Sequence, residues 1–433
     1  MPDVRNNSSR RLKGTAVFFV LLAVLLAVPV SSFGGKKKKD APAAAPPPPI
    51  VVDYSRFVWP NPPAIARVKF TAWFAGDKVD EETTAQKAAK DKKSWMDRLA
   101  GTRPDNEKKI KPHFQLLNPY GMGVDSKGRL YVADAKVGAI FVFNTETRDT
   151  ELIKNGVTAH FAFIIGLAVD DSDDRVFVSD RDLRHVLVIS ADRKVEASIS
   201  EGLVTPGEVA VDSENRLLYV SDVATDQVMV YDADTFKLIR RIGTGNKQHT
   251  LTTPGDFARP GGMAVDKDGN LYVADTMNNR IEIFDADGGF IKEIGKHGDG
   301  PGDFARPKGV AVDSDGHIWV ADGMQDRVHV LNWDGQLLTW LGGKHSLIPG
   351  DFSGLVNVII DKKNRVFTSE IYPGRVQQFR YITDAEAETE KRNREKALEE
   401  KVAQRRGSAA SVPAETVAPK QGEQDKPEGT AAK

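Results

Sequence analysis

One short phrase is repeated six times between residues 124 and 370. Each copy has a Val-Asp pair, or Ile-Asp in the last copy, and nine or ten residues later has Ala-Asp, Ser-Asp or Ser-Glu. Self-similarity at a period of roughly 40 to 50 residues is typical of architectures in which every copy is one supersecondary unit. The steps between successive copies are 45, 42, 54, 47 and 48 residues, counted between Asp125, Asp170, Asp212, Asp266, Asp313 and Asp361.

Each copy can be read as four short β-strands. In the fifth copy, residues 309–313 are small and apolar, a Ser-Asp-Gly turn reverses the chain, and residues 318–321 form a second strand. Residues 328–331 and 337–341 follow as the third and fourth strands. Alternation at period two, with Asp and Gly at the reversals, favours strands joined by tight turns over helices. Four strands in each of six copies predict an all-β, six-bladed β-propeller.

The first strands and the last copy predict how the ring is built. The sixth copy ends after its third strand, at Arg375 to Ile382, so its fourth strand must come from elsewhere in the chain. Residues 67–74 alternate in the same way ahead of the first copy, and we assign them as the strand that closes the ring and removes its exposed edges. Ile359 stands in the sixth first strand, whereas small residues fill the matching crowded positions near the axis: Gly123, Ala168, Ala210, Ala264 and Ala311.

The fourth copy has the fullest motif, with Pro-Gly-Gly-Met-Ala-Val-Asp at 260–266, Leu-Tyr-Val-Ala-Asp at 271–275 and Asn-Arg-Ile at 279–281. This motif resembles the NHL repeat, and the resemblance covers roughly residues 64–382. It implies a six-bladed propeller. Three copies depart from the motif because other residues replace its arginine, and Glu370 replaces its last aspartate, so a complete ring of Asp and Arg is not implied. The replacements of arginine are Ala139, His185 and Gln227.

Composition excludes several classes of function. The chain has 433 residues and a formal net charge of -1, which gives no electrostatic drive toward nucleic acid because phosphate neutralisation requires basic stripes. Cysteine is absent, so disulfides, thiolate nucleophiles, covalent haem attachment and lipoprotein acylation are excluded. We predict no cofactor and no metal ligand set, since neither His-x-His nor His-Glu-x-x-His spacing occurs.

The N-terminal part predicts export. Residues 1–35 contain four basic side chains and then an apolar run from Ala16 to Val30, which suits either a cleaved signal peptide or an uncleaved membrane anchor. Both alternatives place the propeller in the cell envelope, outside the cytoplasmic membrane of a bacterium, in the periplasm or facing outward. Residues 36–63 are rich in Lys and Pro and are predicted to be an extended linker. The propeller itself is predicted to be monomeric.

Three further segments are predicted outside the blades. An insertion at 77–114 has helical composition in its first half and either packs on the side of the ring or binds a partner. Residues 383–406 are dense in Glu, Lys and Arg and predict a solvated charged helix without a heptad seam. Residues 407–433 are predicted to be a disordered tail.

The candidate binding face follows from the topology. Loops from each fourth strand to the next first strand, and turns between second and third strands, are expected to emerge at one end of the ring, where binding sites are usually built. We interpret Asp275 with Arg280, and Asp322 with Arg327, as ion pairs that brace turns. The candidates on this face are His160, Asp180, Arg181, His185, Asp222, His249, Asp275, Asn278, Asn279, Arg280, His297, Asp322, Gln325, Arg327, His345, Glu370 and Arg375.

The sequence leaves three classes of function. The first is a non-enzymatic module that binds a protein or other macromolecular partner through this face. The second is a metal-dependent enzyme with its site at the mouth of the central channel, since six-bladed relatives include a peptide-amidating lyase and sugar lactonases. The third is RNA binding, which export and the missing basic excess disfavour.

Overall fold

The computed structural model describes residues 54–76, 114–154 and 160–410. The predicted signal or anchor segment, nearly all of the insertion at 77–114 and most of the predicted tail therefore lie outside the described residues. Within the described ranges, no helix combines the length and apolar character that crossing a membrane requires.

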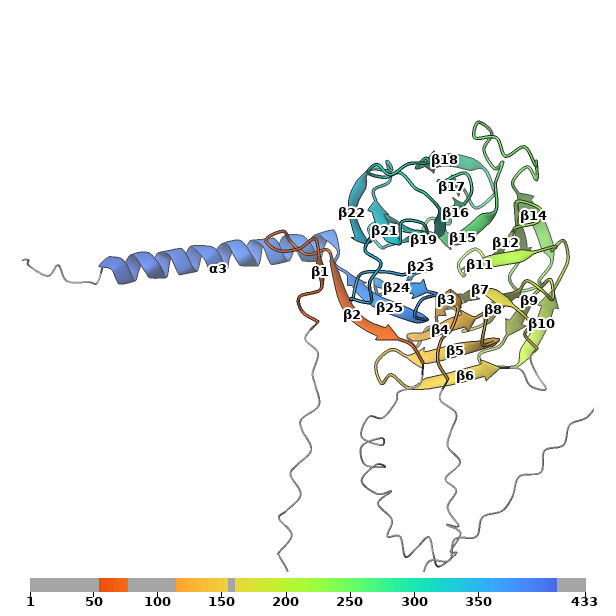
Figure 1. Cartoon of the computed structure of the whole chain (residues 1–433), viewed down its shortest axis with the longest axis horizontal. Helices are drawn as coiled ribbons and strands as arrows, with labels where there is room; N and C mark the ends of the chain where they lie inside the picture. The colour runs from red at the N-terminus through yellow and green to blue at the C-terminus, as the bar shows by residue number, and fades with distance from the viewer. Residues whose placement is uncertain (1–53, 77–113, 155–159, 411–433) are drawn as a thin grey trace, which may run out of the picture. The chain divides into compact units, whose positions relative to one another are not determined.

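Six antiparallel sheets form the predicted ring, with their first strands toward the centre of Figure 1 and their last strands at the rim. Blade 1 consists of β3 (Pro119–Val124), β4 (Arg129–Asp134), β5 (Ala139–Asn144) and β6 (Thr150–Lys154). Blade 2 consists of β7 (Ile164–Val169), β8 (Val176–Asp180), β9 (His185–Ile189) and β10 (Val195–Ile199). Blade 3 consists of β11 (Pro206–Asp212), β12 (Leu217–Asp222), β13 (Gln227–Asp232) and β14 (Leu238–Ile242).

The other three blades repeat this order. Blade 4 consists of β15 (Pro260–Val265), β16 (Leu271–Asp275), β17 (Arg280–Phe284) and β18 (Phe290–Ile294). Blade 5 consists of β19 (Pro307–Val312), β20 (Ile318–Asp322), β21 (Arg327–Leu331) and β22 (Leu337–Gly342). Blade 6 has β23 (Leu355–Ile360), β24 (Arg365–Glu370) and β25 (Arg375–Tyr381), and it is completed by β2 (Val68–Phe74).

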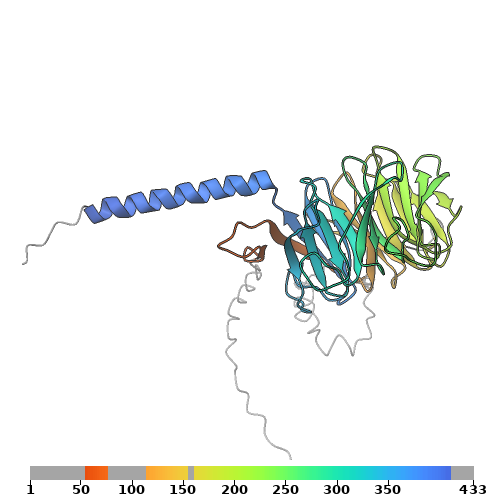
Figure 2. The same cartoon turned by 90° about the horizontal axis from the view of Figure 1, so that it is seen from above.

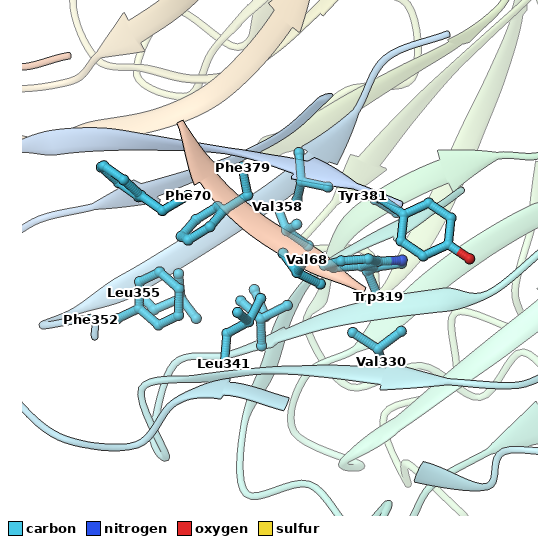
Figure 3. Packing of buried hydrophobic residues seen from close by; sticks show 14 residues of the cluster. Val68, Phe70, Trp319, Val330, Leu341, Phe352, Leu355, Val358, Phe379 and Tyr381 are labelled. Atoms are coloured by element: carbon cyan, nitrogen blue, oxygen red, sulfur yellow. The ribbon is translucent and has the colours of Figure 1, made fainter. Parts of the chain in front are cut away.

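Strand β2 confirms the predicted closure. It pairs antiparallel with β25, with Val68 opposite Tyr381 and Phe74 opposite Val376. Its burial alternates residue by residue, so Val68 and Phe70 enter the core while the intervening side chains face outward. Figure 3 shows Val68 and Phe70 packed with Phe379 and Tyr381 of blade 6 and with Trp319 of blade 5. The N-terminal strand therefore joins two neighbouring blades.

A fifth strand extends blade 6 and was not predicted. Strand β1 (Val58–Trp59) pairs antiparallel with β2, so the last part of the segment predicted as an extended linker belongs to the sheet. Two residues are too few to show alternation at period two, so this strand had no signal in the sequence. Trp59 packs against Phe379 with 5.8 Å between ring centroids, which anchors this short edge strand.

Close approach of the first strands confirms the predicted crowding at Gly123, one of the five small residues near the axis. A Cβ atom placed on Gly123 of β3 would lie 2.9 Å from the backbone nitrogen of Val169 in β7, so a larger residue would push two blades apart. Ile359, the exception, is half-buried and lies at the wall of a central cavity.

The predicted charged helix is confirmed as α3 (Asp384–Ala410), which runs a few residues beyond the predicted end at residue 406. A capping box starts it: the Thr383 amide donates to Glu386 Oε2 at 3.1 Å and the Glu386 amide donates to Thr383 Oγ1 at 3.3 Å. Ala387 packs with Val58 and Ala66, so the first turn is joined to the edge of blade 6 (Figure 2).

Candidate binding face and central cavity

One buried acid in each blade ties two segments together at one end of the ring. In blade 3, Asp222 accepts the amides of Val204 and Thr205 from the incoming loop at 2.6 and 2.8 Å, and those of Ala224 and Thr225 from its own turn at 3.1 and 3.0 Å. Asp134, Asp180 and Asp322 make the equivalent four contacts. Both sets of loops therefore lie at the same end, which we call the loop face.

Two blades use an arginine in place of the turn amides. Asp275 of blade 4 accepts the Ala258 amide at 2.7 Å and the Arg280 Nε at 3.0 Å. Glu370 of blade 6 accepts Arg375 Nε at 2.9 Å and the Ser353 amide at 3.1 Å. Burial raises the pKa of both Asp275 and Glu370, although the guanidinium groups oppose that shift.

These arginines also hold the incoming loops. Arg280 Nη1 donates to the Leu251 carbonyl at 3.1 Å, and Arg375 Nη1 donates to the Leu347 carbonyl at 2.8 Å. The predicted Asp275–Arg280 ion pair is thus confirmed, and it is buried, with 3% of the Arg280 side chain accessible.

The predicted Asp322–Arg327 ion pair is wrong. The carboxylate oxygens of Asp322 accept hydrogen bonds from backbone amides, while the guanidinium of Arg327 lies 5.7 Å from the ring centroid of Trp340. The physical reason is that four backbone amides already donate to the carboxylate of Asp322. The Arg327 side chain therefore turns toward the outer strand, where its guanidinium stacks on an aromatic ring.

The four histidines predicted in the loops of this face do not share a partner. His249 Nδ1 lies 2.7 Å from the Phe257 carbonyl oxygen, and His345 Nδ1 lies 2.7 Å from Asp326 Oδ2. His160 and His297 are exposed. Among the described residues, no three His, Asp or Glu side chains are grouped so that they could hold a metal ion.

The other candidates on this face have local partners. Arg181 lies over the Phe163 ring at 4.1 Å, and His185 Nδ1 lies 2.9 Å from Ser198 Oγ. Burial lowers the pKa of His185. Asn278 donates to Asp275 Oδ2 at 2.8 Å, Asn279 donates to the Met277 carbonyl at 3.2 Å, and Gln325 donates to the Gly298 carbonyl at 3.2 Å.

Large apolar side chains point outward from the loop face. Nine of them lie in its loops and turns, and each is between 38% and 69% exposed. Several of their backbone groups belong to the network around the acids: the amides of Leu117, Leu183, Val204 and Met324 donate to it, and the carbonyls of Leu251 and Leu347 accept from the arginines. The nine are Leu117, Leu183, Val204, Leu251, Met277, Met324, Leu347, Ile348 and Tyr372. Sequence reasoning concentrated on polar residues here and missed this apolar set, although Met277 and Met324 stand at matching turn positions, two residues after Asp275 and Asp322.

The opposite end, which we call the turn face, holds the six repeated first aspartates. They brace their own turns, as predicted: Asp125 accepts the Arg129 amide at 2.8 Å, and Asp361 accepts the Arg365 amide at 2.8 Å. Asp170, Asp212, Asp266 and Asp313 make the corresponding local contacts. This is the Asx-turn geometry that favours Asp before a reversal.

A central cavity of about 950 Å³ opens at the turn face. The C-terminal halves of the six first strands form its wall, including the small residues Gly123, Ala168, Ala210, Ala264 and Ala311. The turns that follow those strands form its mouth, where nine carboxylates and four basic side chains give a formal balance of -5.

A single buried carboxyl interrupts a ring of glycines just beyond this cavity. The third residue of the first strand is glycine in four blades, but it is Glu208 in blade 3 and Asn357 in blade 6. Glu208 is 8% exposed, and among the described residues no hydrogen bond reaches its carboxylate. Burial raises its pKa to about 8. The break in the glycine register is visible in the sequence, and it was missed there because attention lay on the loops.

Comparison with known proteins agrees with the fold. Residues 263–387 match a family described as a 6-bladed beta-propeller, and residues 174–299 match the SMP-30/Gluconolactonase/LRE-like region. NHL repeat-containing protein 2 of Bos taurus is 28% identical over 203 residues, which are 45% of this chain and 24% of that protein. The chain thus spans about a quarter of that relative.

Two other proteins are similar in part. A probable peptidyl-alpha-hydroxyglycine alpha-amidating lyase of Caenorhabditis elegans is 33% identical over 111 residues, which are 25% of this chain and 31% of that protein. The structure of virginiamycin B lyase from Staphylococcus aureus is 12% identical, with a TM-score of 0.46, over 61% of this chain and 96% of that chain.

The ring of six four-stranded sheets, together with both family matches, defines this chain as a six-bladed β-propeller. Its repeat motif fits an NHL-repeat propeller, and NHL repeat-containing protein 2 is similar to part of the chain.

Proposed function

We propose that this propeller is a non-enzymatic binding module of the cell envelope, outside the cytoplasm, whose loop face holds a protein partner. The basic and apolar N-terminal sequence supports export, and the Lys- and Pro-rich segment after it suits a tether.

The nine outward apolar side chains of the loop face carry this proposal. Exposed apolar surface that is rimmed by polar groups marks protein interfaces, because its burial is favourable by roughly 25 cal/mol per Å². The backbones of six of the nine are held by buried acids and arginines, so little of their conformational entropy is lost when a partner binds. The buried acids and arginines of this face, by contrast, make their hydrogen bonds within the protein.

A pull-down from envelope fractions with matched variants tests the proposal. A loop-face variant, Leu251→Ser with Met277→Ser and Met324→Ser, should lose a protein that the unaltered chain retains. A control variant at the rim, Ile239→Ser with Leu338→Ser, has similarly exposed apolar residues and should retain it. Recovery of no specific protein, or equal loss in both variants, would contradict a partner on the loop face.

A metal-dependent enzyme of the lyase or lactonase type is the second candidate function. Its support is the partial similarity to the amidating lyase and the match of residues 174–299 to the gluconolactonase-like region. Metal analysis of the purified protein separates the two: stoichiometric zinc or calcium would favour the enzyme, and loop-face variants would then leave metal content unchanged.

A further inference from the structure

The central cavity lies at the end of the ring away from the loop face, and the proposed partner binding does not use it. We propose that this cavity binds a small amphipathic amine, with the apolar body inside the channel and the ammonium group at the acidic mouth.

The dimensions and walls of the cavity suit such a molecule. Its volume of about 950 Å³ falls at the upper end of the roughly 300 to 1,000 Å³ that small-molecule sites occupy. The wall is formed by side chains such as Met122, Leu167, Val209 and Val310, so a bound alkyl or aryl body would be removed from water. The cavity ends before the third residues of the first strands, which are four glycines, Glu208 and Asn357, because none of these six residues lines it.

The mouth favours a cation. Its formal balance of -5 raises the local concentration of positively charged ligands. Most of these carboxylates brace turns, but among the described residues no side chain makes a hydrogen bond or an ion pair with the carboxylate of Glu214 or of Asp268. A charged ligand would therefore find acceptors without dismantling the turns.

The protein's own lysine already places an ammonium group at this mouth. Lys362 Nζ lies 2.6 Å from Asp171 Oδ2. Lys362 belongs to the turn of blade 6 and Asp171 to that of blade 2, so this contact passes over blade 1, unlike the other contacts between turns, which join neighbouring blades. The lysine side chain is 76% exposed, so a ligand ammonium can replace it at small cost.

Binding of octylamine, octanol and octanoate to the purified chain, measured by calorimetry and by intrinsic tryptophan fluorescence, to which Trp333 at the mouth contributes, tests the proposal. Octylamine should bind saturably, with octanoate about tenfold weaker or worse, a difference of about 1.4 kcal/mol. Asp171→Asn should weaken octylamine several-fold and leave octanol unchanged, because only the charge is removed. Lys362→Ala should strengthen octylamine, since the competing ammonium is gone.

A cavity-filling variant gives an independent readout. Ala264→Ile introduces at one blade the residue type that Ile359 already places at the matching position of blade 6, and it should weaken octylamine and octanol alike by about tenfold. Ala191→Ile, on an exposed turn of the same face, is the matched control and should bind as the unaltered chain does. Absence of saturable octylamine binding, equal affinity for octanoate, or an unaffected Ala264→Ile variant would overturn the proposal. Loop-face variants should bind octylamine normally, so failure here is distinct from failure of the partner hypothesis.

Discussion

The loop face and the turn face each have one repeated acid per blade, but the two sets do different work. Asp222 joins an incoming loop to a turn across 17 and 18 residues of sequence, whereas Asp212 of the same blade braces a turn within three residues. The long-range hydrogen bonds of the first set hold the loops of the loop face in place, and apolar side chains point outward from these loops. On the turn face the repeated acids brace their own turns, other side chains join the turns of neighbouring blades, and the central cavity opens among these turns.

The largest expected effect on stability concerns two single variants of blade 3. One lacks the acid of the loop face, and the other lacks the acid of the turn face. Asp222→Ala leaves four amides of two segments without acceptors and should lower the free energy of unfolding by about 3 to 5 kcal/mol. Asp212→Ala loses only local turn contacts and should cost about 1 to 2 kcal/mol. Urea unfolding measures both. Equal losses would remove the distinction between long-range and local acids.

Glu208, between the two ends, predicts a pH-dependent effect. Its folded pKa of about 8 lies above its ordinary 4.5, so the folded state binds the extra proton and stability should fall as pH rises from about 4.5 to about 8. Glu208→Gln should flatten this slope and make the protein more stable than the unaltered chain at pH 8.5, on the order of a few kcal/mol. Denaturant unfolding at pH 5 and pH 8.5 measures the slope. An unchanged slope in the variant would show that the carboxyl is solvated.

Two histidines of blade 5 should have opposite pH dependence. Burial lowers the pKa of His329 to about 4, so its contribution is lost as pH falls from 6.5 to about 4. At the turn face, the hydrogen bond to Asp313 raises the pKa of His317, so its stabilisation is present below pH 6.5 and is lost as pH rises through the folded pKa. Imidazole NMR titration of His329→Gln and His317→Gln, each lacking one signal, assigns the two pKa values. Shifts of the same sign would contradict the assignment.

The smallest expected effect is at the outward side chains. Met324→Ser should change the free energy of unfolding by less than about 0.5 kcal/mol, because this methionine is exposed on the loop face. Met229→Ser, at a fully buried methionine of blade 3, should cost about 2 to 5 kcal/mol. A large loss in Met324→Ser would mean that the loop-face methionines serve the fold and not a partner.

Periodic features of the chain were predictable, and features that depend on neighbours were not. The six blades, the closure by β2 and the braced turns follow from repeated residues whose geometry is local. Strand β1 could not be predicted, because two residues carry no period and its only support is the neighbouring strand. The outward apolar set and the burial of Asp222 could not be predicted either, since exposure depends on how loops from different blades pack together.

The order of residues alone determined the number of blades and the borrowed strand, because spacing and alternation act along the chain. Only the tertiary structure decided three features. These are the long-range hydrogen bonds at one end of the ring, the place of the open cavity, and the absence of an ion pair between Asp322 and Arg327. Closure brings residues far apart in sequence into competition for the same hydrogen-bonding groups and the same space, and a linear pattern does not contain that competition.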